Sequence, residues 1–133
     1  MTVSEARSLG VSVVRDSRQV YDFLAKPENF PIWASGLCSS IERQGEDWIA
    51  RTPHGPRRVR FTPANPYGVL DHWVVSDDGT EIYVPMRVVP NGSGSEIVIT
   101  LFREPGMSDE RFAEDADWVK RDLAALKGVL EAL

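Results

Sequence analysis

The spacing of hydrophobic residues near the start of the chain predicts a strand followed by a helix. Residues 9–14 form a short apolar run that is typical of a strand. Asp16 is followed three residues later by Gln19, which is the spacing of a capping box. Three apolar residues then share one helical face, namely Val20, Phe23 and Leu24. We therefore expect a first helix at about 17–25.

A second, shorter helix is expected directly after the first. Pro27 ends the first helix and is itself favoured at a first helical position. Ser35 and Gly36 are expected to end the second piece. Its apolar residues are Phe30, Ile32 and Trp33.

The middle of the chain has the pattern of consecutive antiparallel strands separated by turns rich in Gly, Pro, Asn and Asp. Asn91–Gly92 stands between two runs rich in Val and Ile, which is a strong hairpin signal. Six strands fit between the turns, at 37–44, 47–52, 57–62, 68–76, 80–89 and 95–103.

The segment from Ser108 to Leu133 has the clearest helical pattern. Ser108 can cap the helix, and Asp109 and Glu110 lie in its first turn, where carboxylates favour the helix dipole. Six apolar residues recur every three or four positions and so form one stripe, at Phe112, Ala116, Val119, Leu123, Leu126 and Leu130. This stripe is expected to cover an apolar surface.

Alternation in the strands at 68–76 and 80–89 indicates which face is inward. If the Asp78–Gly79 turn pairs residue 75 with residue 81, even-numbered positions lie opposite one another. The even face is apolar except for His72, and the odd face is mixed, so we expect the odd face to be outward, with an Asp71–Arg87 ion pair. The inward apolar set is Leu70, Val74, Ile82, Val84, Met86 and Val88.

His72 is the candidate for chemistry on the inward face. Asp71 is its neighbour in sequence, but adjacent strand residues point to opposite faces, so a catalytic dyad is not expected. Two interpretations of His72 stay open: a core histidine bonded to a backbone or hydroxyl group, which we prefer, and a polar anchor or general base in a pocket.

Arg103, Trp33 and His54 are weaker candidates. In the last strand both faces are apolar; Arg103 reaches a cavity rim if odd-numbered residues face inward, and is otherwise a surface residue, which we prefer. Trp33 is expected in the core, with an indole nitrogen that can point into a cavity. His54 lies in a turn and is expected to be exposed.

Composition and charge limit the classes of partner, location and cofactor that we expect. Lys and Arg number 15 against 20 Asp and Glu, a net charge of −5, so we expect no nucleic-acid partner. No apolar run is long enough for membrane insertion and no secretory signal is present, so a cytoplasmic location is expected. Cys38 is the single cysteine and is expected to be a buried, inert thiol. The two histidines have no spaced carboxylate partners, so we expect no metal and no cofactor.

Several motifs together resemble the SRPBCC superfamily, which includes START domains, the birch-pollen allergen type and the polyketide cyclase/dehydrase group. The motifs are VYDFL at 20–24, PENFPIW at 27–33, GVLDH at 68–72, PMRVVPNG at 85–92 and LFREPGMS at 101–108, with the long helix at the end. The resemblance implies an α+β helix-grip fold: a curved seven-stranded antiparallel sheet, two short helices and a long C-terminal helix over a cavity. We expect one domain over 1–133, with 1–8 as a flexible N-terminal segment.

The resemblance also implies a cavity for a hydrophobic ligand, without a shared catalytic set. Binding of a small hydrophobic or aromatic molecule, as a carrier or sensor, is the first hypothesis. The alternative is a cyclase/dehydrase-type enzyme with His72 as acid or base on a polyketide-like substrate. A third hypothesis is a homodimer or partner surface built on Trp73 and Tyr83. The expected ligand-binding residues are Trp33, Leu70, His72, Val74, Ile82, Val84, Met86, Arg103, Phe112, Val119 and Leu123.

Overall fold

The computed structural model describes residues 2–35 and 37–133, which form strands, short helices and one long helix. Along the chain the elements are β1 (Ala6–Val13), α1 (Ser17–Leu24), the 3-10 helix η1 (Pro27–Asn29), α2 (Phe30–Trp33), β2 (Ser40–Gln44), β3 (Asp47–Thr52), β4 (Gly55–Phe61), β5 (His72–Val75), β6 (Glu81–Val84), β7 (Met86–Asn91), β8 (Gly94–Phe102) and α3 (Asp109–Glu131). Among these residues, no helix is both long enough and apolar enough to cross a membrane.

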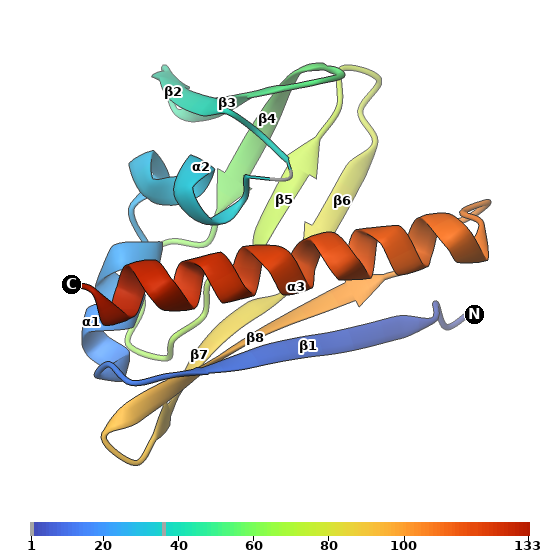
Figure 1. Cartoon of the computed structure of the whole chain (residues 1–133). Coiled ribbons are helices and arrows are strands. Elements are labelled where there is room, and N and C mark those ends of the chain that lie inside the picture. The colour runs from blue at the N-terminus through green and yellow to red at the C-terminus, as the bar shows by residue number, and fades with distance from the viewer. Residues whose placement is uncertain (1, 36) are drawn as a thin grey trace.

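The strands form two antiparallel sheets, and α3 lies across one face of both (Figure 1). One sheet has the order β2-β3-β4-β5-β6, and the other has the order β1-β8-β7. The α+β helix-grip arrangement expected from the sequence is confirmed, but the single seven-stranded sheet is wrong. The difference arises within residues 80–89, for which the sequence pattern predicts one strand.

Pro85 divides that expected strand in two. Before it, β6 pairs with β5, and after it, β7 pairs with β8. Because proline has no backbone N–H, it cannot donate to a strand ladder. Its carbonyl accepts from the Thr100 N–H at 3.0 Å. The chain therefore passes from one sheet to the other at this residue.

The helices near the N-terminus lie close to their expected positions. Asp16 caps α1 through its side chain, which accepts from the N–H groups of Arg18 and Gln19. The second expected helix is a 3-10 turn starting at Pro27 that continues into α2. Gly36, one of the two residues expected to end that piece, lies outside the described residues. Strand β1 begins at Ala6 and pairs with β8 along its whole length, so residues 6–8 belong to the sheet.

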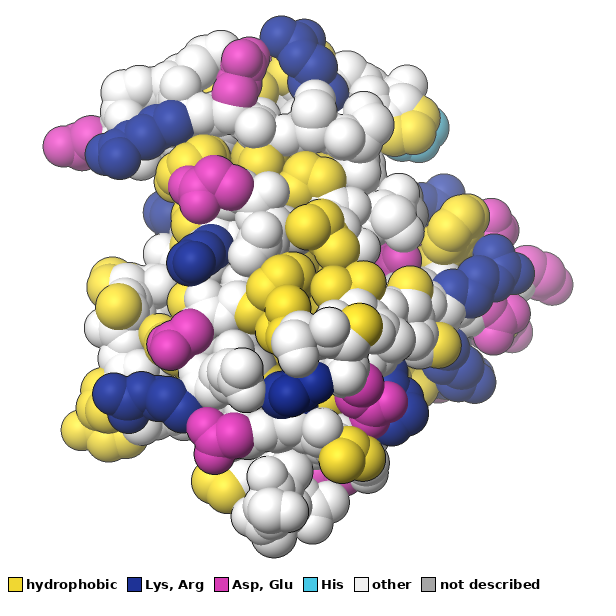
Figure 2. Space-filling view, turned by 60° about the vertical axis from the view of Figure 1, so that its left-hand side comes forward, with side chains coloured by type: hydrophobic (Ala, Val, Ile, Leu, Met, Phe, Trp, Pro, Cys, Tyr) yellow, Lys and Arg dark blue, Asp and Glu magenta, His cyan; other side chains and the backbone are white. Residues whose placement is uncertain are grey.

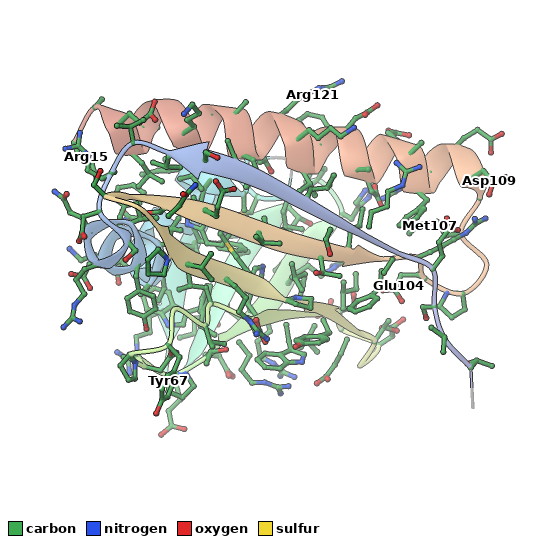
Figure 3. All side chains as sticks on the ribbon, turned by 90° about the horizontal axis from the view of Figure 1, so that it is seen from below. Arg15, Tyr67, Glu104, Met107, Asp109 and Arg121 are labelled. Atoms are coloured by element: carbon green, nitrogen blue, oxygen red, sulfur yellow. The ribbon has the colours of Figure 1, made fainter. Side chains whose placement is uncertain are left out.

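Helix α3 matches the expected helix, and its stripe faces the core. Ser108 caps it by accepting from the Arg111 N–H at 3.1 Å. Five stripe residues are buried and Val119 is partly buried. At the other end, Arg15 donates to the carbonyl oxygens of Leu130 and Glu131, which satisfies two terminal helix acceptors. Arg15 and Asp109 accordingly lie at opposite ends of the helix (Figure 3).

Gly68 has a backbone conformation and a surrounding that only glycine fits. Its φ is +72°, and a Cβ atom would overlap the carbonyl oxygen of Val88. We expect Gly68→Ala to lower the free energy of unfolding by about 1–3 kcal/mol, measured by urea denaturation. Gly79 is the matched control: its φ is +86°, but a Cβ atom at this position would have no described atom within 4 Å. Equal losses at both positions would show that the Val88 contact contributes nothing.

Candidate functional site

A pocket of about 450 Å³ lies between α3, α2 and the strands β5, β6 and β8. Apolar side chains from all of these elements face it, and charged residues of α3 line its other side. The lining residues are Phe30, Trp33, Ala34, Leu37, His54, His72, Val74, Ile82, Val84, Ile99, Leu101, Arg111, Glu114, Asp115, Trp118, Val119 and Asp122.

Aromatic rings form one wall of this pocket. Phe30 and Trp33 are three residues apart on α2, so both point to the same side. Their ring centroids are 4.8 Å apart in an edge-to-face arrangement. His72 at the start of β5 lies edge-to-face against both, at 5.5 Å from Phe30 and 5.6 Å from Trp33. Such contacts favour a defined packing of the rings, so the wall is a preformed aromatic surface.

His72 is an uncharged group in this wall. It is only 4% exposed, and its Nδ1 lies 3.1 Å from the carbonyl oxygen of Leu70. Since a carbonyl oxygen can only accept, Nδ1 carries the proton and Nε2 keeps a free lone pair. Burial lowers the pKa of His72 from 6.5 to about 4, although the Leu70 carbonyl and the charge of Asp71 act in the opposite direction. The imidazole is therefore neutral near pH 7.

Trp33 brings an unused hydrogen-bond donor to the same wall. The residue is 5% exposed, and its indole Nε1 is enclosed and has no hydrogen-bond partner among the described residues. Leaving a buried donor unpaired costs about 1–3 kcal/mol. Buried polar groups are otherwise almost always paired, so this atom requires an explanation.

The helix side of the pocket carries most of its charge. Arg111 donates to Asp115 at 2.9 Å, four residues along α3. Asp122 accepts from the hydroxyl of Ser35 at 2.8 Å, which links α3 to the end of α2. Glu114 adds a third carboxylate, so the described lining has three carboxylates and one arginine, with His54 in the turn between β3 and β4.

Six of the eleven residues expected to bind a ligand line this pocket. They are Trp33, His72, Val74, Ile82, Val84 and Val119. Strands β5 and β6 pair in the register expected from the sequence, with Val75 opposite Glu81 and His72 opposite Val84. The exposed turn position expected for His54 is also observed, and the turn borders the pocket.

The other five expected residues lie outside the pocket lining. Met86, Phe112 and Leu123 are buried in the core, and Leu70 packs against it. Arg103 donates to the carbonyl oxygen of Met107 and forms ion pairs with Glu5 and Asp109. Figure 3 shows Met107 and Asp109 where the chain enters α3. By contacting both residues, Arg103 holds the β8–α3 connection.

The structure shows which face of the last strand, β8, is inward, a point that the sequence left open. Ile97 and Ile99 are buried, so the odd-numbered residues of β8 face inward. This is the arrangement expected to bring Arg103 to the cavity rim, yet the guanidinium of Arg103 turns to the groups named above. Leu101 lines the pocket in its place.

The charged residues and Trp118 on the helix side of the pocket are absent from the set of residues expected from the sequence, which includes only the apolar Val119 from that side. Arg111, Asp115, Trp118 and Asp122 are separated by four, three and four residues, so they form a second stripe beside the apolar one. That spacing is visible in the sequence, and Trp118 within a polar stripe is its signal. Trp118 is 43% exposed and is covered on one side by Arg121, which lies on the side of α3 away from the strands (Figure 3).

Asp71 is separated from His72, as expected for neighbouring strand residues. Its carboxylate accepts from the Met86 N–H, the Tyr83 hydroxyl and two nitrogens of Arg87, all at 2.8–2.9 Å. The expected ion pair with Arg87 is present, but Asp71 is only 6% exposed. Burial alone would raise the pKa of Asp71, and the bonds from Arg87, Met86 and Tyr83 outweigh it and hold that pKa at about 2.

The outer face of the five-stranded sheet carries the aromatic pair proposed as a partner surface. Trp73 and Tyr83 stack at 5.3 Å, and the guanidinium of Arg60 covers Trp73. Hydrophobic side chains are also visible elsewhere on the surface: Figure 2 shows them gathered in the middle of one face, with charged side chains around them. The homodimer stays a prediction.

Two other chemical expectations concern Cys38 and metal ions. Cys38 is buried, and burial, aided by the charge of Asp122, raises the pKa of its thiol to about 11. In the part of the chain that the structure describes, no three His, Cys, Asp or Glu side chains are grouped so that they could hold a metal ion.

No protein-family model matches the chain. A stretch of 81 residues is 32% identical to curated proteins of Streptococcus pyogenes described as "Probable manganese-dependent inorganic pyrophosphatase". That stretch is 59% of this chain, and it spans only about a quarter, 26%, of those relatives' length.

Solved structures show a much more extensive similarity. An uncharacterised protein of Bacillus thuringiensis superposes with a TM-score of 0.73 at 14% identity, over 95% of this chain and 98% of the other. A START superfamily protein of Mycobacterium smegmatis gives 0.69 at 14% identity, over 96% and 97%. Ara h 8.0201 gives 0.68 at 11% identity, over 98% and 100%. The chain therefore has the fold of these proteins, and the resemblance to the SRPBCC superfamily is confirmed at the level of the fold.

Proposed function

We propose that this helix-grip chain binds one small hydrophobic or aromatic molecule in the pocket between α3 and the strands. The observation that carries the proposal is the pocket itself. Its volume of about 450 Å³ is within the range of small-molecule sites, and one wall is aromatic. Val74, Val84 and Ile99 extend that wall with aliphatic surface. Burial of an apolar ligand against it supplies the binding free energy.

A pocket-filling variant tests this proposal. Val119 lines the pocket from α3, so Val119→Trp is expected to weaken binding of the uncharged fluorescent probe N-phenyl-1-naphthylamine at least about tenfold. The reason is that the indole ring occupies the volume the probe needs. The measurement is a fluorescence titration of wild type and variant, with saturation at one probe per chain.

The matched control is Ala124→Trp, which adds the same side chain to an exposed position of the same helix. The control is expected to bind the probe like wild type. Absence of saturable binding to the wild type, or equal affinity of the filled variant and the control, would contradict the proposal.

An enzyme of the cyclase/dehydrase kind is the second candidate, because His72 lines the pocket and keeps a lone pair on Nε2. A general base works best when its pKa lies near the working pH, and the pKa of His72 is about 4. Binding of a ligand as a carrier is therefore better supported than catalysis. His72→Gln separates the two: a carrier retains probe binding, whereas an enzyme loses turnover of any substrate found in the pocket.

A further inference from the structure

We propose that the pocket selects uncharged ligands that carry a hydrogen-bond acceptor, such as ketones, phenols and alcohols, and discriminates against carboxylates. This inference rests on the proposed binding function and adds the chemical class of the ligand. It is carried by three features of the described pocket lining: the unpaired indole N–H of Trp33, the absence of a positive charge in the aromatic wall, and the acidic helix side.

The indole N–H of Trp33 determines the polar group that the ligand needs. Indole nitrogen is a donor only, so its partner must be an acceptor. The atom has no partner among the described residues and almost no access to water, so bulk solvent does not satisfy it either. Trp33 lines the pocket, and a ligand that moves the ring slightly and places an oxygen against Nε1 gains a hydrogen bond for which water competes poorly.

The aromatic wall offers no charged partner to an anion. His72 is neutral near pH 7, and its Nε2 carries a lone pair that repels a carboxylate oxygen. Phe30 presents only hydrocarbon. A carboxylate buried against this wall would lose its hydration without gaining a charged partner, which is strongly unfavourable.

The helix side makes the discrimination stronger. Arg111, the arginine in the described lining, is already paired with Asp115. With Glu114 and Asp122 also present, the described lining holds three carboxylates against one arginine, with His54 in the turn across the pocket. The influence of Asp122 extends inward, because its charge contributes to the raised pKa of the Cys38 thiol. Like charges brought together at a binding site reduce affinity for the wrong ligand.

Three naphthalenes of similar size form the test: 2-acetonaphthone, which has an acceptor only, 2-ethylnaphthalene, which has no polar group, and 2-naphthoate, which is an anion. Their affinities are measured by displacement of N-phenyl-1-naphthylamine. We expect 2-acetonaphthone to bind about fivefold more tightly than 2-ethylnaphthalene, and at least about tenfold more tightly than 2-naphthoate.

Two variants test which residues of the pocket cause the selectivity. Trp33→Phe keeps an aromatic ring and removes the N–H, so 2-acetonaphthone is expected to lose its advantage over 2-ethylnaphthalene. The double change Glu114→Gln and Asp122→Asn keeps side-chain size and removes two charges, so 2-naphthoate is expected to gain about tenfold while 2-acetonaphthone is unchanged. Should Trp33→Phe fail to fold, the indole N–H resonance of wild-type Trp33 is followed instead. It is expected to shift with 2-acetonaphthone and not with 2-ethylnaphthalene.

The outcomes separate this inference from the proposed function. If the fluorescent probe does not bind at all, the binding function itself is wrong. If the probe binds and the three naphthalenes compete equally, or 2-naphthoate competes best, the pocket binds hydrophobic molecules but the selectivity is wrong. An unchanged indole resonance with 2-acetonaphthone would overturn the role of Trp33.

Discussion

Replacing Asp71 by alanine is expected to lower the free energy of unfolding by roughly 3 kcal/mol, because it removes a buried carboxylate that accepts several hydrogen bonds and leaves a buried donor unpaired. The carboxylate of Asp71 accepts four hydrogen bonds from three residues, and one of these donors is the N–H of Met86. That N–H follows Pro85, where the chain leaves one sheet for the other. Without the carboxylate, a buried backbone donor loses its partner at a point where no strand ladder can replace it. Urea denaturation of both proteins measures the loss.

The control for Asp71 is Arg87→Ala, which breaks the Asp71–Arg87 ion pair from its solvent side. The side chain of Arg87 is 48% exposed, and Asp71 retains its bonds from Met86 and Tyr83 after the change. Arg87→Ala is therefore expected to cost less than Asp71→Ala. If Asp71→Ala costs under about 1 kcal/mol, the typical value of an exposed ion pair, the network does not hold the two sheets together.

Acidification is expected to destabilise the protein between pH 6.5 and pH 4 through His72. Burial lowers the pKa of this residue from 6.5 to about 4 in the folded chain. In that interval the unfolded chain binds a proton that the folded chain does not, so stability falls as the pH falls. At about 1.36 kcal/mol for each pKa unit, the total loss is on the order of 3 kcal/mol. Unfolding free energies measured at several pH values report this loss.

His72→Gln is the variant that isolates this effect, because glutamine does not titrate. We expect its stability to change less than that of the wild type between pH 6.5 and pH 4. His54→Gln, at the exposed turn, is the matched control for the change of histidine to glutamine. The low pKa of Asp71 adds a separate loss below pH 3.8, since that carboxylate is protonated more easily in the unfolded chain. Parallel pH curves for wild type and His72→Gln would show that His72 does not titrate in this way.

Ligand selectivity and stability depend on the same buried histidine in different ways. The neutral imidazole that makes the pocket wall unsuitable for an anion is also the group whose protonation opposes folding at low pH. The pH dependence of stability can therefore be measured without any ligand, and it checks the charge state on which the selectivity rests.

Local patterns in the sequence determined the elements whose signals lie within a few neighbouring residues. Asp16 caps α1, and the hairpin indicated by Asn91–Gly92 joins β7 and β8, with Gly92 and Ser93 in the turn. The stripe from Phe112 to Leu130 faces the core, because a period of 3.6 residues fixes which side chains share a helix face. Alternation in β5 and β6 likewise placed His72 and Val74 on the inward face.

Only the tertiary structure decided which inward residues border open space and which are packed. Met86 and Val84 share a face, yet Met86 is completely buried and Val84 lines the pocket, because Pro85 sends them to different sheets. Arg103 has the facing expected of a rim residue, but Asp109 and Glu5, the latter distant in sequence, bind its guanidinium. The Trp33 nitrogen, which has no partner among the described residues, and the acidic side of the pocket likewise depend on how α2 and α3 meet. Alternation along one strand carries no information about contacts between segments far apart in the chain, and those contacts define the pocket.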